Sequence, residues 1–146
     1  MFSTILVAYD GSDHAKSALK VAADLAKIYG AKLHLTHTLQ IDTPPIVVGA
    51  LVAALEPVPT RAQIEKAGEQ IIALARSEAK ALGVEIDEVH LSAYEPARAI
   101  LTTAEKIGAD LIVLGRRGLG SIGSFALGSV SLSVSHGAKC ACLTVL

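Results

Sequence analysis

A glycine- and serine-rich segment near the end of the chain is the part of the sequence best suited to hold a phosphate group. Residues 115–129 read GRRGLGSIGSFALGS and contain five glycines and three serines. Glycine lets the backbone approach a ligand closely, serine adds hydroxyls, and a following helix would turn its N–H groups and positive dipole end toward the same place. A surface turn has the same composition, so the segment alone predicts either a phosphate cradle or a turn.

An acidic residue, Asp10, directly follows the apolar run Thr4–Tyr9 at the start of the chain. Beside a phosphate cradle, its carboxylate would accept hydrogen bonds from ribose hydroxyls or help to hold a divalent cation bound to the phosphates. The other interpretation is that Asp10 caps the helix expected after it. The chain has no GxxxxGK[ST] motif, and a dinucleotide fingerprint would follow the first strand rather than the fourth. Those two kinds of phosphate site are therefore excluded.

The sequence predicts binding rather than turnover. Hydrolysis of a nucleotide needs a positioned water, charge neutralisation and usually a base. The converging segments supply one carboxylate and no lysine in the phosphate loop, and His14, the nearest candidate base, is better explained as a solvent-facing residue. The other histidines belong to separate elements and show no metal-ligand spacing. We therefore predict no catalytic residue and no metal site built by the protein alone.

The elements that must position these residues are marked by four glycine tripeptides. They begin at Gly30, Gly83, Gly108 and Gly137, and each follows a helix-like stretch and precedes a short apolar run. Glycine there is typical of the left-handed residue that ends a helix. With the first apolar run, they predict a single α/β domain with five parallel strands, order 3-2-1-4-5, and four helices on both faces. Asp10 and the glycine-rich segment then leave neighbouring strands at the switch point.

The helices are expected at four places along the chain. The first runs from Ser12 or Asp13 to Tyr29, the third begins near Pro96 and ends before Gly108, and the fourth spans Ser124 or Gly128 to His136. The second opens with a Thr60–Gln63 capping box. Its expected inward positions are Ile64, Ala67, Ile71, Leu74 and Ala75. The long connection Gln40–Pro59 is interpreted either as a short helix over the sheet edge or as a lid or partner contact.

Composition narrows the possible partners and compartment. A formal net charge of −1 offers no global field for nucleic acid or an anionic membrane. The longest uncharged apolar run, Ile46–Leu55, is too short to span a bilayer, and the first residues do not resemble a signal peptide, so a cytoplasmic protein is predicted. Cys140 and Cys142 lack the spacing of a redox or zinc pair and are interpreted as core thiols.

Glycines 115, 118 and 128, with Ser129, complete the pattern GxxGx9G[ST]. In this pattern the chain resembles the ATP-binding branch of the universal stress protein family. The resemblance extends over the whole chain, through the segments ILVAYDGS at 5–12, LHLTHT at 33–38 and GADLIVLG at 108–115, and through the final strand. It implies the 3-2-1-4-5 sheet, homodimers and an adenine nucleotide held between strands one and four.

The resemblance also implies a role for individual residues. Asp10 matches the acidic residue near the ribose and metal, and Thr38 matches the backbone position that meets adenine. The phosphate loop is matched by Gly115, Gly118, Gly128 and Ser129, and Val130 and Ser131 complete this part of the expected set. From their charge, Arg116 and Arg117 are expected to contact phosphate as well, or one of them to be solvated. The expected ligand is ATP, with Mg²⁺ or Mn²⁺ bound through the phosphates. One departure is Tyr94-Glu95-Pro96, where the family often has Gly-x-Pro.

Three functional hypotheses follow from this sequence. The favoured one is an ATP-binding regulatory module of a stress response; the others are a slow ATPase or autophosphorylating protein, and a dimeric scaffold with a structural nucleotide. A homodimer through the C-terminal strand is expected because residues 140–146 are apolar to the end of the chain. As a sheet edge they carry no lysine, proline or glycine that would block pairing with a second copy.

Overall fold

The computed structural model describes residues 1–39, 59–93, 95–118 and 127–146. Across these residues, strands and helices alternate along the chain as predicted. They are β1 (Thr4–Ala8), α1 (Asp13–Tyr29), β2 (Lys32–Thr38), α2 (Arg61–Ala81), β3 (Glu88–Ser92), α3 (Pro96–Ile107), β4 (Leu111–Gly115), α4 (Ser129–Gly137) and β5 (Ala141–Val145). All strands are parallel, in the order β3-β2-β1-β4-β5, which confirms the predicted fold class.

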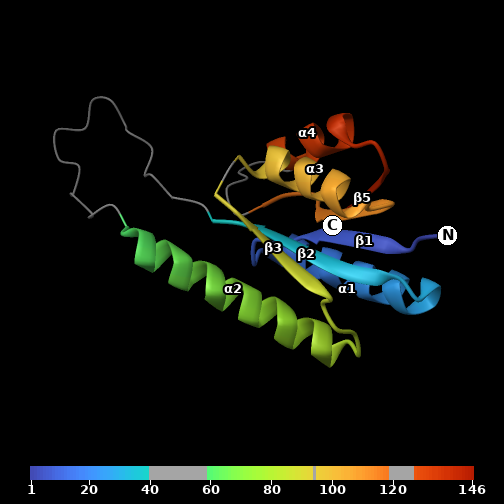
Figure 1. Cartoon of the computed structure of the whole chain (residues 1–146), viewed down its shortest axis with the longest axis horizontal. Coiled ribbons are helices and arrows are strands. Elements are labelled where there is room, and N and C mark those ends of the chain that lie inside the picture. Colours follow the sequence, from blue (N-terminus) through green and yellow to red (C-terminus); the bar gives the residue numbers. More distant parts are fainter. Residues whose placement is uncertain (40–58, 94, 119–126) are drawn as a thin grey trace.

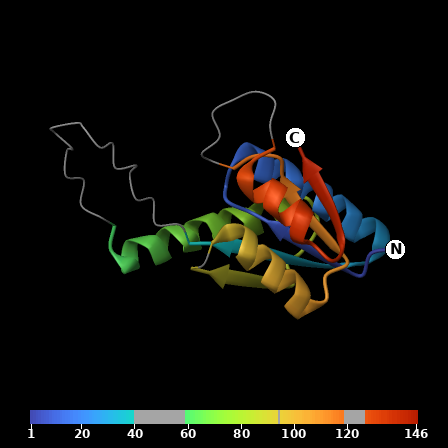
Figure 2. The same ribbon diagram turned by 90° about the horizontal axis from the view of Figure 1, so that it is seen from above.

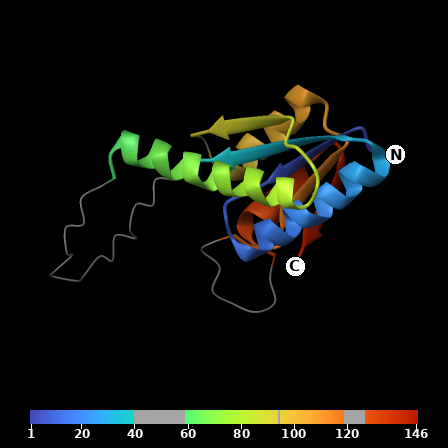
Figure 3. The ribbon, with the colours of Figure 1, turned by 90° about the horizontal axis from the view of Figure 1, so that it is seen from below.

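The sheet is the middle layer of three (Figure 1). Helices α3 and α4 cover the face seen from above (Figure 2), and α1 and α2 cover the face seen from below (Figure 3). Successive residues of β1 point to opposite faces, so Ile5 and Val7 are buried against α1 while Leu6 is buried on the α3 side. Both faces of the central strand are therefore apolar, as expected of a covered parallel sheet.

Three of the four predicted glycine helix ends are confirmed. Gly30, Gly83 and Gly108 have φ angles of 64°, 77° and 65°, in the left-handed region that favours glycine. Gly137 is a correction, because it is the last residue of α4 and the helix is capped by Ala138 with φ −70°. A Cβ on Gly137 would lie 2.7 Å from Leu101 Cδ1, so glycine lets α4 pack closely on α3 without moving that side chain.

Helix α2 begins with the predicted capping box. The Gln63 N–H donates to Thr60 Oγ1 at 3.3 Å, and the Thr60 N–H donates to Gln63 Oε1 at 2.7 Å. Its predicted inward face is partly wrong, since Leu74 is 42% exposed. Ala67 is also exposed, and the buried positions are Gly68, Ala75 and Ala79. The first turns of α2 extend beyond the strands (Figure 1), and the buried face of the helix is a narrow strip of small residues.

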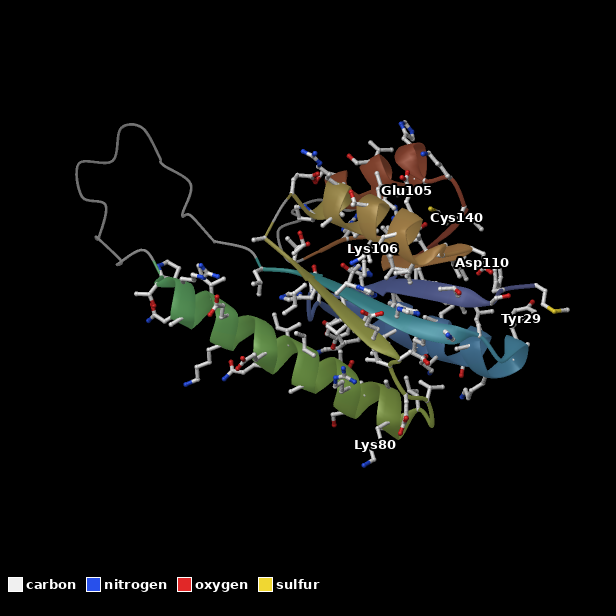
Figure 4. All side chains as sticks on the ribbon, in the orientation of Figure 1. Tyr29, Lys80, Glu105, Lys106, Asp110 and Cys140 are labelled. Atoms are coloured by element: carbon white, nitrogen blue, oxygen red, sulfur yellow. The ribbon has the colours of Figure 1, made fainter. Side chains whose placement is uncertain are left out.

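Asp110 joins the N-terminal ends of the two central strands (Figure 4). Its carboxylate accepts the N–H groups of Ser3 and Thr4 at 2.7 and 3.3 Å, and its own N–H donates to the Thr4 carbonyl at 3.0 Å. These bonds fix β1 beside β4 at the end of the sheet opposite the glycine-rich segment. Among the described helices, none combines the length and apolar character needed to cross a membrane.

Candidate functional site

The two segments predicted to form the site meet at the carboxyl ends of β1 and β4. These strands are neighbours in the sheet, with Val7 paired to Val113. Just beyond them, Gly118 lies against Asp10, since a Cβ on Gly118 would sit 2.7 Å from Asp10 Oδ2. The glycine-rich segment therefore approaches a carboxylate that comes from the far end of the sequence.

The Asp10 carboxylate has two different neighbours. Its Oδ1 accepts the Ser12 N–H at 2.9 Å, while Oδ2 lies on the side of Gly118. Helix α1 is capped by Ser12, whose Oγ accepts the Ala15 N–H at 3.2 Å. Gly11 makes the turn between strand and helix possible with φ +83°. Capping is thus the task of Ser12, and the Asp10 carboxylate braces the turn and faces the glycine-rich segment.

The end of β4 packs directly on the first turn of α1. A Cβ on Gly115 would lie 2.8 Å from both the carbonyl carbon and the Cβ of His14. No larger residue fits at 115 without separating the strand from the helix. His14 is half-buried at this contact and is not the fully solvent-facing residue that the sequence allowed.

The beginning of α4 is held against the end of β4. The Gly128 N–H donates to the Arg116 carbonyl at 2.9 Å, and the buried Ser131 Oγ donates to the Gly115 carbonyl at 2.8 Å. A Cβ on Gly128 would lie 3.3 Å from the Arg116 carbonyl oxygen and 3.4 Å from Arg117 Cα. The two described ends of the glycine-rich segment therefore meet. Gly120, Ser121, Gly123 and Ser124 lie outside the described residues.

The first turn of α4 has the properties of an anion-binding helix end. Gly128 provides no side-chain cap, and the N–H groups of Ser129, Val130 and Ser131 have no acceptors within the helix. Ser129 is exposed and Ser131 is buried. Val130 is half-buried against the apolar side chains between α3 and the sheet. The positive end of the helix dipole and an exposed hydroxyl thus lie beside the end of β4.

The end of β2 is tied to the end of β1 by a histidine that the sequence analysis did not select. His37 is 6% exposed, and its Nδ1 lies 2.8 Å from the Tyr9 carbonyl oxygen, to which it donates. The Tyr9 hydroxyl donates to Glu78 Oε2 at 2.8 Å, and burial together with Glu78 raises the pKa of Tyr9. Thr38, next to His37, is half-buried at the strand end. One signal in the sequence could have identified His37 as buried: side chains alternate between the two faces of a strand, so residue 37 shares a face with Leu33 and Leu35.

The predicted site residues thus fall into two groups. Asp10 and the end of β4 contact each other through Gly118, and the end of β4 contacts α4 through Arg116 and Gly128. Thr38 stands at the end of the strand on the other side of β1. Arg116 and Arg117 directly follow β4 in the sequence, and both are half-buried.

The chain is similar to known proteins in both sequence and fold. The model of the universal stress protein family matches residues 1–145. A universal stress protein of Thermus aquaticus is 43% identical over 99% of both chains.

Two solved structures illustrate the likeness in fold. A universal stress protein of Archaeoglobus fulgidus superposes with a TM-score of 0.76, at 25% identity over 100% of both chains. A universal stress protein in complex with cAMP superposes with a TM-score of 0.69, at 27% identity over 99% of this chain and 97% of that one.

Proposed function

This chain belongs to the universal stress protein family, and we propose that it binds an adenine nucleotide between the ends of β1 and β4. We further propose that the ligand is ATP with Mg²⁺ or Mn²⁺, and that the protein is a nucleotide-dependent regulatory module of a stress response. The likeness to a family member in complex with cAMP supports the nucleotide class.

The observation that carries the proposal is the contact of Gly118 with Asp10. A Cβ at position 118 would come within 2.7 Å of the carboxylate, so glycine lets the segment approach Asp10 without displacing that carboxylate. A carboxylate next to a glycine-rich backbone suits a ligand that carries both phosphates and ribose hydroxyls. A surface turn would need no such approach, and this favours the phosphate-cradle interpretation.

The remaining residues fit an adenine nucleotide in their chemistry. The first N–H groups of α4, from Ser129 to Ser131, and the Ser129 hydroxyl would hold phosphate oxygens. Asp10 would accept from the ribose or help to hold a phosphate-bound divalent ion, and the Thr38 backbone would meet the adenine. Arg116 and Arg117 would add positive charge. The negative charge of the bound phosphates would then distinguish the nucleotide-bound protein from the free protein.

Binding without fast turnover suits this set of groups. Among the described residues that line the strand ends, Asp10 is the carboxylate of the site, and Ser131, a possible nucleophile, donates its hydroxyl to a backbone carbonyl. Neither arrangement positions a water for attack on a phosphate. We therefore propose that the bound state itself is the signal, with a slow ATPase as the competing outcome to be measured.

We also propose a homodimer in which β5 pairs with a second copy. The strand is the last of the sheet, and Leu143 is 37% exposed along it. Val145 turns its carbonyl toward β4, where it accepts the Arg116 N–H. The N–H and C=O of one residue in a strand point the same way, so Cys142 and Thr144 direct theirs outward. These outward groups are the ones a partner strand would pair with.

Binding is tested on protein purified without added nucleotide. Mass spectrometry identifies any retained ligand, and calorimetric titration then compares ATP, AMP and cAMP with and without Mg²⁺. We expect ATP with Mg²⁺ to bind to one site per chain, and phosphate release to stay at the background rate. Failure of every adenine nucleotide to bind would contradict the proposal, while tight binding of AMP or cAMP alone would keep the site and reject ATP.

A further inference from the structure

Two histidines and a glutamate on neighbouring strands lie close together away from the nucleotide crevice. We propose that His34, Glu88 and His90 bind a divalent transition-metal ion, for which zinc is the best match. His34 Nδ1, Glu88 Oε2 and His90 Nε2 all lie within 4.8 Å of one another. Imidazole and carboxylate are the ligand types that zinc takes in proteins alongside thiolate.

The sheet register explains why the three residues meet. Strands β2 and β3 are parallel, with His34 opposite Glu88 and Thr36 opposite His90. Side chains two residues apart in a strand share a face, so all of these point to the same side of the sheet. That side is the one covered by α3, because His34 is the register partner of Leu6, which packs on α3.

The distances between the ligand atoms suit a four-coordinate ion. His34 Nδ1 and His90 Nε2 are 3.2 Å apart, and each lies 3.7–3.8 Å from Glu88 Oε2. With metal–nitrogen bonds of about 2.0–2.1 Å, two ligands of a tetrahedral zinc are about 3.3 Å apart. The histidine pair already has this spacing. The Glu88 side chain is 63% exposed and has room to close the remaining few tenths of an ångström.

The two rings are nearly parallel, at 17°, and without a metal their facing nitrogens share one hydrogen. When an ion binds, that hydrogen moves to the other nitrogen of the same ring, which gives the alternative neutral tautomer. Both rings must also turn in their own planes, because the facing nitrogens now point at each other and the ion would lie to one side of the line between them. Three protein ligands leave a fourth position for water, as in open zinc sites. The site would then link the edge strand β3 to β2 through a metal as well as through the backbone.

The surroundings hold the ligands in place and leave an entrance. The side chains of His34 and His90 are 10% and 12% exposed, whereas Glu88 reaches solvent and marks the way in. Asp87 fixes the register beside them, since its Oδ2 accepts the Leu33 N–H and its N–H donates to the Leu33 carbonyl, both at 2.8 Å. Preorganised ligands of this kind lose little freedom when the ion binds.

Two further neighbours bear on the site. The hydroxyl of Thr36, on the same face and opposite His90, is buried without a hydrogen-bond partner among the described residues, so the cluster borders a polar group that lacks a partner. Lys106 of α3 (Figure 4) is close enough for its positive charge to have a small electrostatic effect at His90, and this charge would repel a bound cation. Glu88 carries the opposite charge in direct contact with both rings, at under 4 Å, and outweighs Lys106.

The test uses the full chain, treated with a chelator and then kept in buffer free of nucleotide and phosphate. Titration with Zn²⁺ alone by calorimetry should give one ion per chain. Co²⁺ should give the visible absorption of a tetrahedral site without a thiolate charge-transfer band, which separates this site from Cys140 and Cys142. A hundredfold excess of Zn²⁺ over its Kd should raise Tm by about 5 °C or more.

Substitutions assign the ion to these residues. His90→Gln and Glu88→Gln should each weaken Zn²⁺ binding at least tenfold, since even supporting residues around a metal cost about 10- to 100-fold. The matched controls are His136→Gln, an exposed histidine in the last turn of α4, and Cys140→Ser; both should bind like the unmodified protein. Glu88 is exposed, so its variant will fold even if His90→Gln does not.

Three results would overturn the proposal. One is that the unmodified protein shows neither a Co²⁺ spectrum nor a rise in Tm with Zn²⁺. The two histidines would then form a hydrogen bond and no metal site. Another is loss of binding in His136→Gln or Cys140→Ser but not in Glu88→Gln. The last is several weak ions per chain with no effect of any substitution, which is adventitious surface binding.

Discussion

Replacing Asp10 with asparagine separates a ligand-binding role from a structural one. Asparagine keeps an oxygen that can accept the Ser12 N–H, which now reaches Asp10 Oδ1 at 2.9 Å. It removes the negative charge and places an amide at the oxygen beside Gly118. Because Ser12 caps α1, the helix retains its cap in Asp10→Asn.

The size of each effect follows from these contacts. A hydrogen bond to a charged acceptor contributes about 1.5–3 kcal/mol and a neutral one about 0.5–1.5, so the turn at Asp10 should lose about 1 kcal/mol. For a chain of this length that lowers Tm of the free protein by about 2–4 °C. If Asp10 also accepts from ribose or holds a phosphate-bound ion, binding loses a further contact of about 1.5–3 kcal/mol, or about 10- to 150-fold in Kd for ATP.

The matched control is Asp13→Asn. Asp13 is the first residue of α1, its side chain is 99% exposed, and it pairs only with Lys16 on the helix surface, at 3.3 Å, among the contacts described. It therefore carries the same charge near the same helix end without facing Gly118. We expect this variant to change Kd less than twofold and Tm by under about 2 °C.

The assays are calorimetric titration with ATP and Mg²⁺, and thermal unfolding without nucleotide. Unchanged or tighter ATP binding in Asp10→Asn would refute the reasoning, because the carboxylate would then brace the turn and nothing more. Equal losses of affinity in Asp10→Asn and Asp13→Asn would also refute it, since the cause would be the general field at the helix end.

Three other substitutions test the rest of the site and the dimer. Gly118→Ala should displace the Asp10 carboxylate, lower ATP affinity about as much as Asp10→Asn, and add little to it in the double variant, as binding titrations of all three will measure. Ser129→Ala should cost about 0.5–1.5 kcal/mol of ATP binding with no change in Tm, because its side chain is exposed; a loss of stability instead would give it a structural role. Thr144→Pro removes an outward N–H of β5 and should give a folded monomer by light scattering, whereas Leu143→Pro breaks the ladder to β4 and should lower Tm; a dimeric Thr144→Pro would reject pairing through β5.

The fold was predictable because its signals are local. Strands β2, β3 and β4 each follow a glycine that ends a helix, and the strands at the centre of the sheet are apolar runs that only a covered sheet can bury. The handedness of the crossovers then limits the possible strand orders. Gly137 shows the limit of that reasoning. Its place in the sequence matches those of Gly30 and Gly108, but Gly137 does not have their positive φ and instead lies against Leu101, a residue of another helix. A requirement for space is not visible until the helices are packed.

The candidate site was predictable in its location and less so in its details. Asp10 and Ser12 are both good helix caps, and two residues of separation cannot decide between them. The turn at Gly11, with φ +83°, decides it by placing Ser12 at the helix start. His34 and His90 are 56 residues apart, and only the register of β2 and β3 brings their rings together. Spacing rules for metal ligands apply within a segment and do not detect such a pair.

The pairing of β1 with β4 has a consequence for the order of folding. Helix α1 is the one element between β1 and β2 in the chain. The β1–α1–β2 unit can therefore form early, because its contacts join residues that are close in sequence. Its pairing with β4 joins Ile5 to Leu111 and must wait until most of the chain has been synthesised and a long loop has closed. The crevice exists only after that step. A ligand that holds both strand ends would therefore act on the most non-local strand pairing of the sheet, and should slow the unfolding of β4 and β5 more than that of β2 and β3.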